Sequence, residues 1–317
     1  MIISIPDVWG AAVNRHHAYV KKIIQEALAV SNPKPIGSPF LVTLLKTEAK
    51  TLAVGKPDEL EGLIDKVDQW LASATATEQR VFRAEAKRVF NYGAFSKKSQ
   101  SSWDAYALCK SSRHSLCPYC QQAFAFTLVV QKKVKTGGVS RRGFRPTLDH
   151  YFPKSEYPYL GLSLYNLVPA CQTCNSSLKS TTNFYKEKHL HPLRDEECLR
   201  FELKPKAYIR YLEGGTAGLG LKVVNDDAKM SSQANASIET FLLNKRYAFH
   251  ARELARLIES LKRWTPDVIA QLAISSGAKG AVDQFEAMLL NFDHLAYKSE
   301  MLGRIKLDLY NAVRAAP

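Results

Sequence analysis

The chain has 317 residues, of which 46% are hydrophobic and 10% are aromatic, and its formal net charge is +14. This length and composition supply a full apolar core, which excludes an intrinsically disordered chain. The first thirty residues carry charge throughout and contain no long apolar run, which argues against a signal peptide and a membrane anchor. We therefore expect a folded, soluble protein of the cytoplasm with no membrane contact.

Apolar residues recur at helical spacing through the N-terminal third of the chain and predict three helices there. The predicted ranges are 13–30, 60–71 and 81–90. The third helix is expected to open behind Thr77, with Glu78 in its first turn. No group of catalytic residues stands out in this part, so residues 1–100 are predicted to form an N-terminal helical region.

The pattern changes after 97–102, which has the composition of a linker. Alternating and β-branched residues predict one strand over 123–130 and a second extended run over 143–152. A Gly-Gly turn at 137–138 lies between them. The expected result is a strand pair that ends near His150.

Further along, 163–169 is a short apolar segment, and 173–180 fits one or two helical turns. Glycine turns within 207–224 predict a β-hairpin, and amphipathic helices are expected over 237–264 and 282–313. The predicted fold class is therefore α+β and mainly helical. We expect a central module at 101–200, followed by a region at 201–317 that holds the hairpin and the C-terminal helices.

Positive charge is concentrated in the middle of the chain. Residues 131–190 contain ten Lys or Arg residues against three acids, a net charge of +7. A run of charge is often only a solvated face, but this one also suits a phosphate backbone.

Four of the six cysteines form two Cys-x-x-Cys pairs, which together are a complete ligand set for one tetrahedral zinc ion. The pairs are Cys117 with Cys120 and Cys171 with Cys174. A closed shell of four thiolates leaves no position for water, so this zinc is expected to be structural. A redox pair is the competing interpretation, although it would not need a second pair. Cys109 and Cys198 are expected to be free thiols.

The segments LDHYFPKS at 148–155 and YNLVPACQTCNSSLK at 165–179 resemble the signature of the HNH endonucleases. The resemblance covers roughly residues 115–195. It implies a ββα-metal fold with a four-cysteine zinc knuckle as the central module.

The chemistry of phosphodiester hydrolysis matches the residues of this motif. His150 is the candidate general base, because neutral imidazole accepts a proton near neutral pH. Asp149 and Asn175 offer oxygen ligands to a catalytic Mg²⁺ or Mn²⁺. The resemblance implies that Asn166 fixes the orientation of the imidazole.

Five basic residues are candidates for nucleic-acid contacts: Lys179, Arg141, Arg142, Arg145 and Lys154. Lys179 follows Asn175 by four residues, at a position where some members of the family carry a metal-binding histidine. Since an ammonium group cannot bind a metal ion, Lys179 is expected to contact phosphate. The alternative for the three arginines is that they lie at the tip of a hairpin and are exposed to solvent without binding a ligand.

The leading hypothesis is a metal-dependent endonuclease that cuts double-stranded DNA. An RNA-cleaving nuclease and a non-catalytic zinc-knuckle adaptor that binds nucleic acid remain alternatives. The chain also resembles HNH subunits of bacterial anti-phage defence systems such as Septu, which implies a partner protein such as an ATPase.

Overall fold

The computed structural model describes residues 1–97, 103–133, 139–214, 219–277 and 282–315, so the linker predicted at 97–102 lies outside them except for its first residue. The chain forms two compact units. The N-terminal unit consists of Ser4–Ser115 and Ala125–Asp195, and the C-terminal unit consists of Met1–Ile3, Leu116–Phe124 and Glu196–Pro317. The regions expected at 1–100 and 101–200 therefore contribute mostly to the same unit.

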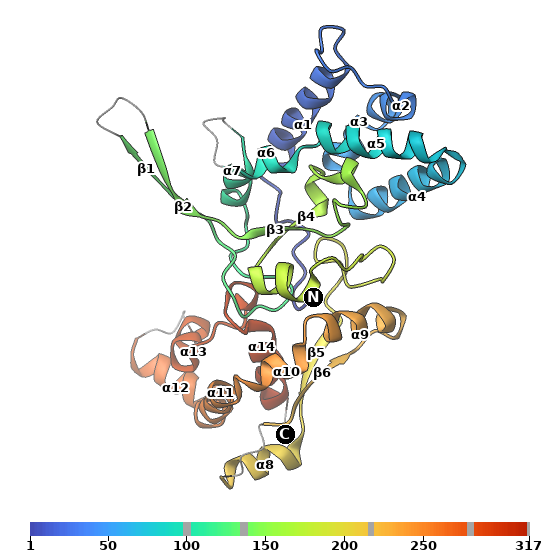
Figure 1. The fold of residues 1–317 in the computed structure, drawn as a ribbon. Helices are drawn as coiled ribbons and strands as arrows, with labels where there is room; N and C mark the ends of the chain where they lie inside the picture. The colour runs from blue at the N-terminus through green and yellow to red at the C-terminus, as the bar shows by residue number, and fades with distance from the viewer. Residues whose placement is uncertain (98–102, 134–138, 215–218, 278–281, 316–317) are drawn as a thin grey trace. The chain divides into compact units, whose positions relative to one another are not determined.

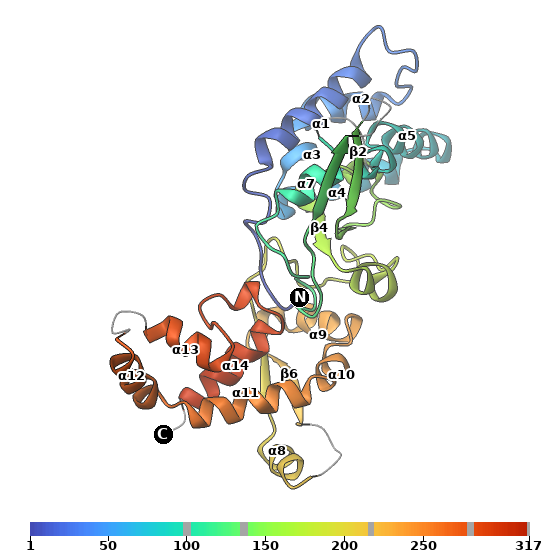
Figure 2. The same cartoon turned by 90° about the vertical axis from the view of Figure 1, so that its left-hand side faces the viewer.

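The first half of the N-terminal unit is helical, and Figures 1 and 2 show its helices α1 to α5 gathered in one group. The helices are α1 (Val13–Leu28), α2 (Pro39–Thr47), α3 (Ala49–Val54), α4 (Pro57–Ser73), α5 (Ala76–Val89), α6 (Tyr92–Ser96) and α7 (Ala105–Lys110). Helix α4 buries one stripe of aliphatic residues at helical spacing, which is the pattern that predicted it. Helix α5 begins two residues earlier than expected, because Thr75 rather than Thr77 forms the capping box with Glu78.

Four strands and three short helices complete this unit. The strands are β1 (Leu128–Lys133), β2 (Val139–Phe144), β3 (Thr147–His150) and β4 (Leu167–Ala170). The short helices are η1 (Pro158–Leu160), η2 (Leu164–Asn166) and η3 (Thr173–Lys179). Strand β1 pairs with β2, and β3 pairs with β4, both in antiparallel register.

The strand pairing differs from the predicted one. The second predicted run, 143–152, is divided at Pro146, and its two parts belong to different sheets. Proline has no backbone N–H to give to a ladder, which favours a break at this position. The apolar segment at 163–169 supplies most of the true partner of β3, so His150 lies opposite Leu167.

The C-terminal unit combines one strand pair with seven α-helices among the described residues. Its strands are β5 (Leu199–Leu203) and β6 (Leu221–Asn225), which pair in antiparallel register. Its helices are α8 (Pro205–Leu212), η4 (Ala228–Met230), α9 (Ser231–Thr240), α10 (Leu243–Ala248), α11 (Ala251–Arg263), α12 (Pro266–Ser275), α13 (Val282–Leu290), η5 (Tyr297–Ser299) and α14 (Gly303–Arg314). Leu257, Leu261, Leu290 and Phe292 form a buried cluster, to which α11 and α13 contribute.

The hairpin predicted at 207–224 is wrong, because its second strand pairs with β5 at 199–203 and not with the first half of the segment. Residues 221–225 form strand β6, but the first half of the segment is helix α8, which opens with Pro205 in its first turn. The Tyr208 hydroxyl of α8 donates a hydrogen bond to Glu259 at 2.8 Å and accepts one from Lys262 at 3.2 Å, both on α11. These contacts with α11 stabilise a helix at Pro205–Leu212, where the local sequence suggested a strand.

The prediction of a mainly helical α+β chain is confirmed, and the described strands form three sheets of two strands each. None of the described helices combines the length and the apolar composition needed to cross a membrane.

His16 on α1 is a buried imidazole in the core of the N-terminal unit. Its Nε2 is 2.7 Å from the Leu162 carbonyl, and Trp103 donates to its Nδ1 at 3.2 Å. Because one partner accepts and the other donates, both nitrogens are satisfied only in the neutral ring. Burial lowers the pKa of His16 to about 4, against which the Leu162 bond acts weakly.

Stability should therefore depend on pH in a defined window. The unfolded His16 takes up a proton near pH 6.5 and the folded one only near pH 4, so stability falls as pH drops between these values. We expect this residue to contribute a loss of up to about 3 kcal/mol. His16→Gln offers one donor and one acceptor without titrating, so urea unfolding from pH 7 to 4 should give a flatter profile. Identical profiles for the two proteins would contradict this reading.

Candidate active site

Strand β3, strand β4 and helix η3 bring the predicted catalytic residues into one region of the N-terminal unit. Asp149 and His150 end β3, Asn166 directly precedes β4, and Asn175 lies in η3. The Asn175 N–H donates to the Cys171 carbonyl at 3.0 Å, which ties the start of η3 to the second cysteine pair. Residues that the sequence separates by up to 26 positions thus lie around one strand pair.

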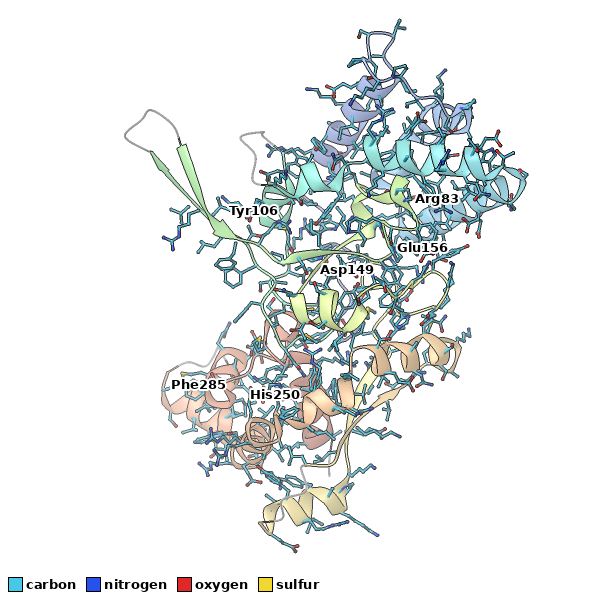
Figure 3. The ribbon with its side chains drawn as sticks, in the orientation of Figure 1. Arg83, Tyr106, Asp149, Glu156, His250 and Phe285 are labelled. Atoms are coloured by element: carbon cyan, nitrogen blue, oxygen red, sulfur yellow. The ribbon has the colours of Figure 1, made fainter. Side chains whose placement is uncertain are left out.

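A cavity of about 810 Å³ opens in this unit, and Asp149, His150 and Asn175 line it together. Its lining includes four cationic side chains against one carboxylate. The cations are Arg83, Lys87, Lys154 and Lys179. Figure 3 shows Asp149 on β3 and Arg83 on α5. A cavity with this charge balance suits an anionic ligand such as a phosphate group.

His150 is held with a defined tautomer. Its Nε2 is 3.0 Å from the Gly161 carbonyl, which can only accept, so Nε2 carries the proton and Nδ1 carries the lone pair. The Tyr92 ring packs edge-on against the imidazole at a centroid distance of 4.4 Å. Burial, followed by the charge of Lys154, lowers the pKa of His150 to about 3, and the Gly161 bond opposes the shift. The imidazole is therefore neutral at physiological pH and carries a lone pair on Nδ1, but the same burial makes it a weaker base than a free imidazole.

Asn166 does not bond the imidazole itself. Its side-chain oxygen accepts from the Phe152 N–H at 2.7 Å, and its amide donates to the carbonyls of Phe152 and Leu160 at 3.1 Å each. These bonds close the loop that returns from β3 to Gly161. Because the Gly161 carbonyl is the partner of His150, Asn166 is connected to the imidazole through this loop and not by a direct bond.

Lys179 lies in a different environment from the one expected for a phosphate contact. Its ammonium donates to Asp149 Oδ1 at 2.7 Å, to the His150 carbonyl at 2.5 Å and to the Tyr151 carbonyl at 3.2 Å. The side chains of Lys179 and Asp149 are only 2% and 3% exposed. Burial lowers the pKa of Lys179, and the carboxylate beside it counteracts that shift. All three ammonium protons are used, so none is left for a phosphate oxygen.

The side chains expected to hold a catalytic Mg²⁺ or Mn²⁺ are of the right chemical type, but one of them already binds another cation. Asp149 and Asn175 line the same cavity and carry the hard oxygen atoms that these ions prefer. However, Asp149 Oδ1 is already bound by the Lys179 ammonium. A divalent ion would use this carboxylate oxygen only if the ammonium moved away.

The four paired cysteines form a compact group that fits a zinc ion. Their Sγ atoms all lie within 4.8 Å of one another, and all four residues are buried. A tetrahedron with zinc–sulfur bonds of about 2.3 Å has sulfur atoms roughly 3.8 Å apart, so small shifts would complete the site. None of the cysteines in the described residues forms a disulfide. The group is therefore compatible with a structural zinc knuckle.

The backbone around each pair is shaped for sulfur ligands. In the first pair, the Gln122 N–H points at Cys120 Sγ from 3.5 Å, and in the second the Cys174 N–H points at Cys171 Sγ from 3.4 Å. Such N–H groups stabilise the negative charge of a thiolate. Cys109 is different, because burial raises the pKa of its thiol to about 12, which keeps it protonated.

Compared with protein-family models, with curated proteins and with solved structures, this chain matches none. The functional assignment therefore rests on the residues themselves.

The predicted nucleic-acid contacts are placed unequally. Lys154 is exposed at the cavity, and its ammonium lies 5.5 Å from the centre of the Tyr92 ring. Arg142 is exposed on β2, whereas the side chain of Arg141 lies outside the described residues. Arg145 is half-buried and donates to the carbonyls of Pro146 and Ser96 at 2.8 and 3.3 Å. Arg145 is thus engaged within its own unit.

Helix α5 contributes to the cavity in a way that the sequence did not suggest. Arg83 and Lys87 are four residues apart on one face of this helix, and both line the cavity. Arg83 also donates to the Glu156 carbonyl at 2.8 Å, which fixes the loop after β3. The only local signal was the spacing of two basic residues, which is common on solvated helices.

His191 follows the second cysteine pair in the sequence and is a further histidine of this unit. Its ring packs against the Tyr151 ring at a centroid distance of 3.9 Å and an interplanar angle of 30°, and the residue is fully buried.

Proposed function

We propose that the protein is an HNH-type endonuclease that hydrolyses phosphodiester bonds in double-stranded DNA. The observation that carries this proposal is His150, a neutral imidazole with its tautomer fixed by Gly161, beside Asp149 in a cavity whose charged lining residues are four cations and one carboxylate. The antiparallel pair β3–β4 followed by η3 supports it, since the resemblance implies a ββα arrangement.

The proposed chemistry uses the lone pair of His150 Nδ1. A water oxygen attacks the phosphorus atom while His150 takes one proton from that water, and the bond from phosphorus to the leaving oxygen breaks. The leaving oxygen then takes a proton from solvent. Asn166 keeps the imidazole in place through the loop that carries Gly161.

Charged residues of the cavity bind the substrate and offset its charge. Lys154 and Lys87 are exposed and free to approach phosphate oxygens, and Arg83 lines the same cavity. Mg²⁺ or Mn²⁺ held by Asp149 and Asn175 would supply further positive charge near the leaving oxygen.

The β1–β2 ribbon supports a nucleic acid as the substrate. It extends away from the helices of its unit, and Arg142 is exposed on it (Figure 1). Between Asp104 and Asp149 the chain contains eight Lys or Arg residues and no acid. A two-stranded ribbon has the width that fits the major groove of duplex DNA, and basic side chains on it would neutralise phosphates.

The wider setting of the protein, as the nuclease effector of an anti-phage complex with an ATPase partner, is proposed from the resemblance alone. RNA as the substrate and a purely binding role are the alternatives.

The test is a cleavage assay with purified, zinc-loaded protein, supercoiled plasmid and structured RNA in the presence of Mg²⁺ or Mn²⁺. We expect nicked and linear plasmid, and slower loss of RNA. Preferential loss of RNA would shift the proposal to a ribonuclease. Salt-sensitive binding without turnover of either substrate would favour the adaptor.

A further inference from the structure

We infer that the ammonium of Lys179 occupies the cation position beside Asp149, and that a divalent ion binds Asp149 only in competition with it. The inference deepens the proposed function and rests on it only for the catalytic role of the ion. Lys179 would in this way control whether a metal ion can reach the carboxylate of Asp149.

The first observation is the set of atoms around the ammonium. One carboxylate oxygen and two backbone carbonyl oxygens surround Lys179 Nζ, from Asp149, His150 and Tyr151. A carboxylate with carbonyl oxygens is a ligand set that hard cations such as Mg²⁺ and Mn²⁺ prefer. In this protein the same oxygens hold an ammonium group.

The second observation is the packing around this cage. The Phe184 ring lies 4.6 Å from Lys179 Nζ and the Tyr151 ring lies 5.8 Å away, so aromatic faces cover the ammonium. Aromatic faces stabilise a positive charge from which water is excluded. Phe184 and Tyr151 are themselves almost fully buried, which gives the cage fixed walls. The site is therefore built to hold a cation at this point.

The charge of Lys179 affects how tightly a divalent ion can bind at Asp149. With the ammonium in place, the charge of Asp149 is balanced, and an arriving Mg²⁺ is repelled by a positive charge in a poorly solvated region. Without the ammonium, the buried Asp149 carboxylate would lose this counter-charge, and a divalent ion could supply a positive charge in its place. Lys179 should therefore weaken the binding of divalent ions at Asp149.

A purely structural role for Lys179 makes the opposite prediction. If the lysine only ties η3 to the end of β3, its loss would loosen Asp149 and weaken metal binding. The direction of the change in affinity distinguishes the two roles.

The experiment compares the affinity of zinc-loaded wild type and zinc-loaded Lys179→Met for Mn²⁺. The electron paramagnetic resonance signal of free Mn²⁺ measures the binding. Methionine keeps an unbranched apolar chain but carries no charge. We expect the variant to bind Mn²⁺ at least about 10-fold more tightly, and Asp149→Asn in the variant background to abolish the gain. Lys154→Met removes a charge from the same cavity without touching Asp149, and should change the affinity by less than about 3-fold. Equal or weaker binding by Lys179→Met overturns the inference.

Two further measurements apply if Lys179→Met does not fold. Lys179→Gln keeps side-chain N–H donors for the carbonyls without the charge, and should show the same tightening. In the wild type, the slowly exchanging Nζ–H signal of the buried ammonium should shift or vanish when Mg²⁺ saturates the protein. An unchanged signal at saturation would refute the competition. If the variant bound Mn²⁺ tightly but the wild type cleaved no nucleic acid, the nuclease proposal would be wrong and the competition between Lys179 and the ion would stand.

Discussion

Replacement of His150 by alanine is expected to lower the rate of plasmid cleavage by roughly 10²–10⁴-fold, the usual effect of losing a general base. The imidazole is neutral, its Nε2 is committed to the Gly161 carbonyl, and it lines the cavity with the cationic side chains. No other histidine lines that cavity, in the part of the chain that the structure describes. Initial rates of nicking at fixed Mg²⁺ measure the effect.

The control for this prediction must separate chemistry from folding. His17→Ala removes a less buried imidazole of helix α1, which does not line the cavity, and should cleave at the wild-type rate. The His150→Ala protein should keep its zinc content and should unfold cooperatively. Cleavage by well-folded His150→Ala within about 3-fold of wild type would show that another group activates the water.

Loss of zinc is expected to have the largest effect on stability. Cys174→Ser should lose the bound zinc and more than about 4 kcal/mol of stability, because metal binding to such sites is coupled to folding. Three of the four sulfur atoms would remain, but a closed tetrahedral shell needs all four. Zinc content by atomic emission and thermal unfolding by circular dichroism measure the two effects. Excess chelator should bring the wild type toward the behaviour of the variant.

Cys109→Ala is the matched control for the zinc prediction. Cys109 is also buried, but it lies outside the cysteine group, so this variant should keep one zinc ion per chain. It should lose only the packing of one small side chain. A Cys174→Ser protein with full zinc content and wild-type stability would remove the structural role of the site. Removal of Mg²⁺ from the wild type should stop cleavage but leave the thermal transition nearly unchanged, in contrast to removal of zinc.

Local signals in the sequence were sufficient for several features. Helical periodicity located α4, α5 and α11, because each buries one stripe of apolar residues. The long helices expected over 237–264 and 282–313 were wrong in their bounds, because the first range is divided among α9, α10 and α11 and the second among α13, η5 and α14. The spacing within each Cys-x-x-Cys pair indicated a zinc site, since two thiolates from one tight turn suit tetrahedral coordination. The Asp-His step and the following asparagines indicated which residues to examine for catalysis. In each case the information lies within a few neighbouring residues.

The strand partners, by contrast, were decided by tertiary structure. The strand run at 143–152 looked continuous, yet its halves pair with β1 and with β4, and β4 lies seventeen residues after β3. Long-range pairing depends on which surfaces can be buried together, and local propensity does not record that. The same reason applies to α8, which packs on α11 instead of forming a strand.

The sequence by itself determined the mainly helical α+β class, and it indicated the cysteine ligands and the candidate base. Only the tertiary structure decided which partner each functional group has. In the folded chain, the imidazole of His150 bonds the Gly161 carbonyl, and Lys179 is buried against Asp149. Arg83, from a helix distant in the sequence, lines the cavity. The physical reason is that a side chain's charge state and availability depend on desolvation and on neighbours far away in the chain. For Lys179 this turned a residue expected to bind phosphate into an internal cation.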